Sequence, residues 1–111
     1  MIPICLIGDF NMHAVEKAVG WWGEQGIHFV VEAEDNGNPG IDCVAVMLHP
    51  SLADLGLRGL TVQGEYVPVI GIAHRGDAKA IAHELGHAVL GSAHDNRKHH
   101  IMSSPHPGWR R

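Results

Sequence analysis

The sequence lacks the features that define several large protein classes. Among its 111 residues, only 5% are aromatic and 18% are charged, and the net charge is −4 with neutral histidines. There is no basic cluster of the kind that binds nucleic acid. No apolar run approaches the roughly 20 residues that a membrane-spanning helix needs. We therefore predict one domain over residues 1–111, a monomer that binds neither nucleic acid nor a membrane.

Cysteine is also scarce, with only Cys5 and Cys43 in the chain. The two residues fall in separate strand-like segments, and we predict free buried thiols. A disulfide and a thiol that blocks a zinc site are the alternatives. The apolar segment 1–9 lacks a basic start and a small-residue cleavage site, so we predict a strand rather than a signal peptide and a cytoplasmic location.

Histidine, in contrast, is abundant, and two of the ten histidines form the pattern His-Glu-x-x-His at His83, Glu84 and His87. Residues four apart on a helix share one face, so both imidazoles can reach one metal ion. Two histidines and a third ligand leave a zinc ion one open position for water. Glu84 projects about 100° away around the helix and could move a proton without binding the metal. With so many histidines, a chance match is the alternative.

The surrounding residues favour a real helix at this pattern. Asp77 is a suitable N-cap, and Gly91 is a suitable residue to end the helix in a left-handed conformation. An apolar stripe with helical spacing is formed by Ile81, Leu85, Ala88 and Val89. Such a stripe indicates a helix with one side in the core. We therefore predict a zinc site on a helix that begins near residue 76.

The third zinc ligand is less constrained by the sequence. Residues 85–111 contain no glutamate, which argues against a site completed by glutamate. The candidates are His94, Asp95, His99, His100 and His106. We favour His94, which lies three residues after Gly91, with Asp95 as the alternative.

The segment from His83 to Asp95, followed by Ile101 and Met102, resembles the metzincin metalloproteases. Their signature is HExxHxxGxxH followed by a turn that contains methionine. The resemblance implies a zinc-dependent endopeptidase acting on a peptide or protein. It assigns one zinc ion to His83, His87 and His94, the role of general base and acid to Glu84, and the turn methionine to Met102. The motifs that carry it lie within residues 76–104.

The chain departs from the metzincin signature at one point. Four steps separate His87 from Gly91, where the family has three, so one residue is inserted before the glycine. In a regular helix one residue rotates everything after it by about 100°. The strict position of the third ligand is occupied by Ala93, which cannot bind metal. The approach of His94 to the metal therefore depends on how the turn accommodates the insertion.

Hydrophobic patterns and turn residues predict an α/β (α+β) fold. The expected strands are Ile2–Phe10, Ile27–Glu34, Ile41–Leu48, Gly59–Gln63 and Val67–His74. We expect a helix at Met12–Gln25 and a helical turn at Ser51–Leu57 besides the zinc helix. This order matches the upper subdomain of a metzincin, which implies a twisted, mixed, mostly parallel sheet with two main helices and an antiparallel edge strand. Only nine residues follow Met102, so we expect a truncated lower subdomain and a shallow cleft.

In the metzincin family the antiparallel edge strand borders the cleft. The matching segment here is Gly59, Leu60, Thr61 and Val62, which we predict to bind an extended peptide through its main chain. An ordinary edge hairpin is the alternative for this segment. For the whole chain, the alternatives to an endopeptidase are a non-catalytic, zinc-stabilised binding module and a zinc hydrolase of non-peptide amides.

Overall fold

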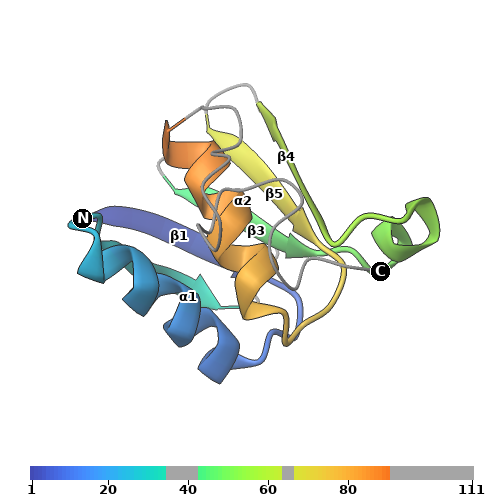
Figure 1. Ribbon diagram of the computed structural model, residues 1–111, viewed down its shortest axis with the longest axis horizontal. Helices are drawn as coiled ribbons and strands as arrows, with labels where there is room; N and C mark the ends of the chain where they lie inside the picture. The colour runs from blue at the N-terminus through green and yellow to red at the C-terminus, as the bar shows by residue number, and fades with distance from the viewer. Residues whose placement is uncertain (35–42, 64–66, 91–111) are drawn as a thin grey trace.

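The structure is a computed structural model that describes residues 1–34, 43–63 and 67–90 (Figure 1). Its elements are β1 (Ile2–Ile7), α1 (Met12–Glu24), β2 (Phe29–Glu34), β3 (Val44–Leu48), the 3-10 helix η1 (Pro50–Leu55), β4 (Gly59–Gln63), β5 (Pro68–Ile72) and α2 (Ala78–Leu90). Each predicted element is present in the predicted order, and most are a few residues shorter than expected. The bounds of β4 agree with the prediction at both ends.

The five strands form a single sheet in the order β2-β1-β3-β5-β4. The pairs β1–β2, β1–β3 and β3–β5 are parallel, and β4 runs antiparallel to β5 at the edge. The predicted mixed, mostly parallel sheet with an antiparallel edge strand is therefore confirmed. The α/β class is confirmed with it.

Helices α1 and α2 contact each other and pack on the same face of the sheet (Figure 1). The core lies between this helical layer and the sheet. Its largest fully buried side chains are Ile4, Leu6, Val15, Val46, Ile70, Ile72, Ile81 and Leu85. The indole Nε1 of Trp22 on α1 donates a 2.8 Å hydrogen bond to the carbonyl oxygen of Ala82 on α2, which joins the two helices inside this layer. Among the helices described, none has the length and apolar character needed to cross a membrane.

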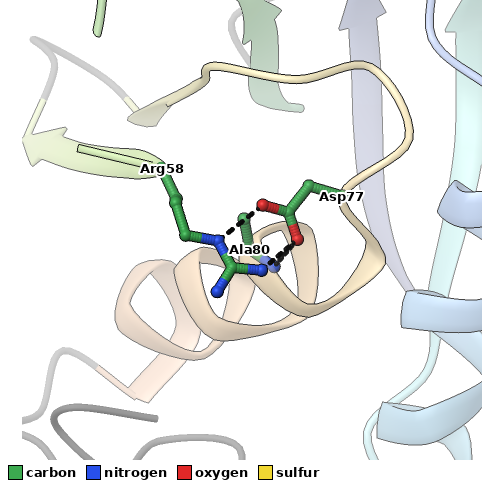
Figure 2. Close-up of polar contacts among 3 residues, drawn as sticks. All are labelled: Arg58, Asp77 and Ala80. Carbon is green, nitrogen blue, oxygen red and sulfur yellow. Dashed lines mark hydrogen bonds and ion pairs between the residues drawn. The ribbon is translucent and has the colours of Figure 1, made fainter. Parts of the chain in front are cut away.

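A polar contact ties the start of β4 to the start of α2 (Figure 2). Arg58 donates from Nε and Nη2 to the two carboxylate oxygens of Asp77, at 2.8 and 2.6 Å. Asp77 also accepts a 3.1 Å hydrogen bond from the backbone N–H of Ala80, so it is the helix N-cap that the sequence predicts. Both side chains of the ion pair are largely shielded from water. A two-bonded pair in such surroundings fixes orientation as well as distance, so β4 and α2 are held in one relative position.

The prediction of two free thiols is wrong, because Cys5 and Cys43 form a disulfide. Strands β1 and β3 are parallel neighbours, and Ile4 pairs with Val44. This register brings the Cα atoms of the two cysteines to 5.9 Å, within the usual range for a disulfide. Periodicity alone does not show that β1 lies beside β3, because β2 comes between them in the chain.

Candidate metal centre

The central turns of α2 carry His83, Glu84 and His87 in a largely buried setting. His83 is 3% exposed and Glu84 is 5% exposed, whereas His87 is partly buried. His83 and Glu84 are the two buried polar or charged residues in the described part of the chain. Burial of such groups costs free energy unless hydrogen bonds or a metal ion compensate for it. We therefore expect hydrogen bonds or a metal ion to compensate for the burial of His83 and Glu84.

The two imidazoles face each other through the nitrogen atoms that commonly bind metal. His83 Nε2 and His87 Nε2 are 3.2 Å apart, and the ring planes meet at 80°. Two nitrogens bound to one tetrahedral zinc ion at about 2.0–2.1 Å lie about 3.3 Å apart. The pair therefore fits two positions of a tetrahedral site. Without a metal ion, one ring can donate its N–H to the other, depending on the tautomers.

The side chain of Glu84 lies against strand β4. The hydroxyl Oγ1 of Thr61 donates a 2.6 Å hydrogen bond to Glu84 Oε1. A Cβ atom built on Gly59 would lie 2.7 Å from Glu84 Cγ and 3.2 Å from Oε2, so only glycine leaves room for this carboxylate. Burial raises the pKa of Glu84 above its ordinary value of 4.5, while the Thr61 hydrogen bond and the charge of His87 oppose that rise.

Strand β4 divides the four residues predicted to bind substrate between two faces. Gly59 and Thr61 face α2 and contact Glu84. Leu60 and Val62 lie on the opposite face, where they are 43% and 49% exposed. Sequence reasoning missed the contacts of Gly59 and Thr61 with Glu84. The period of two in a strand places these residues on one face, but it does not show which face meets the helix.

The exposed face of the sheet carries a separate hollow of about 260 Å³. It is lined by Met47, His49, Leu52, Leu60, Val62, Val69, Ile70 and Gly71, which are mostly apolar. Its side chains from β4 are Leu60 and Val62, whereas Thr61 on the other face contacts Glu84. The hollow is therefore distinct from the histidine pair.

The remaining predicted site residues lie outside the described residues. These are His94, Asp95 and Met102, together with His99, His100 and His106. In residues 1–34, 43–63 and 67–90, no group of three or more histidine, cysteine, aspartate or glutamate side chains is placed to hold a metal ion. The third ligand, the turn methionine and the truncated lower subdomain stay predictions.

The raised pKa of Glu84 predicts a pH-dependent effect of the variant Glu84→Gln in metal-free protein. Folded wild type holds the Glu84 proton more tightly than unfolded wild type does, so wild-type stability falls as the pH rises from 4.5 through the folded pKa. Glutamine carries no charge at any pH. The variant should therefore gain stability relative to wild type as the pH rises through this range. Urea unfolding at several pH values with a chelator measures the free energy of unfolding of both proteins. A variant that loses stability relative to wild type as the pH rises would contradict the prediction.

The interpretation of this centre as a zinc site depends on His83, Glu84 and His87 and on their geometry. The resemblance to the metzincins, the zinc ion and the enzymatic activity all stay predictions. Comparisons with protein-family models, curated proteins and solved structures give no match for this chain.

Proposed function

We propose that the protein is a zinc-dependent endopeptidase. His83 and His87 bind the zinc ion, His94 supplies the third protein ligand, and Glu84 is the general base and acid. The observation that carries the proposal is the 3.2 Å separation of the two Nε2 atoms, which suits two ligands of one tetrahedral ion. A carboxylate held one residue after the first histidine completes the set of groups needed for hydrolysis.

The arrangement of the sheet supports this proposal. The strands and α-helices follow the order β-α-β-β-β-β-α, and the antiparallel strand β4 precedes the last strand in the chain. Helix α2, which carries the histidine pair, contacts both β4 and β5. This is the order expected for the upper subdomain of a metzincin, in which the edge strand borders the cleft.

Glu84 has the features of a group that moves protons. Its Oε1 accepts a hydrogen bond from Thr61, which leaves Oε2 to take a proton from the attacking water and deliver it to the leaving amine. Burial raises the pKa of Glu84 above its ordinary value, which makes the ionised carboxylate a stronger base toward a water proton. When bound, zinc would supply a Lewis acid for the peptide carbonyl and lower the pKa of a water molecule.

The edge strand offers a place for an extended peptide. β4 ends the strand order of the sheet, and no described strand pairs with its outer edge. Main-chain hydrogen bonds to such an edge bind peptides with little dependence on side chains. We therefore propose that the substrate is a peptide or protein segment that adds to β4 as a further strand.

Two linked measurements test the proposal. The first is the zinc content of purified wild type and of Glu84→Ala, for which we expect one tightly bound ion in each. The second is cleavage of a peptide library, which wild type should perform and Glu84→Ala should not. Equal inertness of the two zinc-loaded proteins would rule out the protease function.

The burial of the centre also supports a second candidate, a non-catalytic binding module stabilised by zinc. Glu84 is 5% exposed and its carboxylate is already engaged by Thr61, as in a structural network. In this case a chelator should unfold the domain, because metal-binding free energy becomes folding free energy. Glu84→Ala would then leave binding of a partner unchanged. Wild type that binds zinc but cleaves no peptide would favour this candidate.

A further inference from the structure

The face of β4 that meets α2 contacts Glu84, the proposed general base, through Thr61 and Gly59. We propose that Thr61 is a positioning residue, whose hydroxyl holds the Glu84 carboxylate in the orientation from which it takes the proton of the attacking water. This inference rests on the proposed endopeptidase function. It adds to that function a residue outside the zinc motif, on a different element of the fold.

The hydrogen bond between the two side chains carries the inference. Thr61 Oγ1 and Glu84 Oε1 are 2.6 Å apart, a separation typical of a hydroxyl that donates to a charged carboxylate. The same hydroxyl lies 3.2 Å from the main-chain carbonyl oxygen of Glu84, so it is located over this residue rather than over its neighbours. A hydroxyl has one proton, and the nearer Oε1 receives it. Oε2 is therefore the oxygen left for water.

The strand limits the freedom of both partners. Thr61 is β-branched, which restricts rotation about its Cα–Cβ bond. It pairs with Ile70 within the β4–β5 ladder, so its backbone is fixed by the sheet. Gly59, two residues earlier on the same face, lies so close that a Cβ atom there would meet Glu84 Cγ at 2.7 Å and Cδ at 3.3 Å. The absence of a side chain at Gly59 makes room for the carboxylate that Thr61 orients.

Thr61 lies on the strand that contacts Glu84 and that we propose to bind the peptide. The outer edge of β4 would bind the peptide through its main chain, while the inner face of the same strand holds Glu84. A shift of β4 would therefore move the peptide and the base together. The Arg58–Asp77 pair, which fixes β4 against the start of α2, keeps this unit in place.

The test compares Thr61→Val, which keeps the shape of threonine but removes the hydroxyl, with Thr61→Ser, which keeps the hydroxyl. With zinc-loaded proteins and a cleaved peptide, Thr61→Val should lower kcat by about 10-fold or more, because hydrogen bonds to charged groups are worth at least this factor. KM and zinc affinity should stay within about twofold, since the substitution leaves the main chain of β4 in place for the peptide and Thr61 is not among the proposed zinc ligands. Thr61→Ser should restore most of kcat. Thermal unfolding of both variants checks that they fold.

A second readout does not depend on activity. In metal-free protein, the NMR chemical shift of the Glu84 side-chain carboxyl carbon should change in Thr61→Val and return toward wild type in Thr61→Ser. An unchanged shift and unchanged kcat in Thr61→Val would overturn the inference. If wild type cleaves peptides and Glu84→Ala does not, that result would leave the proposed function standing. If zinc-loaded wild type cleaves nothing, the proposed function and this inference fail together.

Discussion

Replacing His83 or His87 by alanine should weaken the affinity of the protein for zinc by more than about 100-fold. Loss of a residue that only orients a ligand usually costs 10- to 100-fold in metal affinity, and loss of a ligand itself costs more. The two Nε2 atoms lie 3.2 Å apart, close enough to bind one ion together. Either substitution leaves only one histidine of the pair to bind it. Competition with a chromophoric chelator at fixed pH measures the change.

A matched control comes from a histidine on the other helix. His13 is exposed on α1 and belongs to no predicted ligand set, so His13→Ala should bind zinc as wild type does. Its inclusion separates the effect of the site from the loss of one of ten histidines. Equal zinc affinities for His83→Ala, His87→Ala and His13→Ala would show that the pair is not the metal site.

Reduction of the Cys5–Cys43 disulfide should lower the free energy of unfolding by about 4 kcal/mol. The two cysteines are 38 residues apart, and closing a loop of this length restricts the unfolded chain by roughly that amount. For a small domain this is a large part of the total stability. Urea unfolding with and without a thiol reductant measures the loss.

The double variant Cys5→Ala/Cys43→Ala is the control for this experiment. It should be less stable than oxidised wild type, and the reductant should have no effect on it. A reductant that leaves the wild-type unfolding curve unchanged would contradict the prediction. That result would mean that the thiols are not joined in the folded protein.

The disulfide also bears on the predicted cytoplasmic location. Disulfides form and persist in oxidising compartments and are rare in cytosolic proteins, where thiols are kept reduced. The location is predicted from the composition of residues 1–9. The cytoplasmic location stays a prediction, and the bond between Cys5 and Cys43 argues against it.

Local patterns predicted much of the fold. The turn residues around β4 defined its ends, and Asp77 was identified as the N-cap of α2 because capping depends on neighbouring residues alone. The order of strands and helices, through its match to the upper subdomain of a metzincin, predicted a mostly parallel sheet, which the strand pairings confirm. The ends of a strand and the cap of a helix are encoded within a few residues of where they occur.

The contacts that local patterns could not predict join distant segments. Thr61 bonds to Glu84 across 23 positions, and Cys5 is linked to Cys43 across 38. Each contact depends on which strands are neighbours and which strand face meets a helix. A single sequence contains no direct signal for either property. The histidine pair differs from these contacts because both its members lie on one helix at a spacing of four residues.

Zinc binding by His83 and His87 together is the proposal on which the endopeptidase function depends. The most direct test is a crystal structure of the protein grown with zinc, with anomalous diffraction recorded at the zinc absorption edge. We predict one anomalous peak about 2.0–2.1 Å from the Nε2 atoms of both histidines. A tightly bound zinc ion elsewhere in the molecule, with no metal ion between the two rings, would contradict a shared site at His83 and His87.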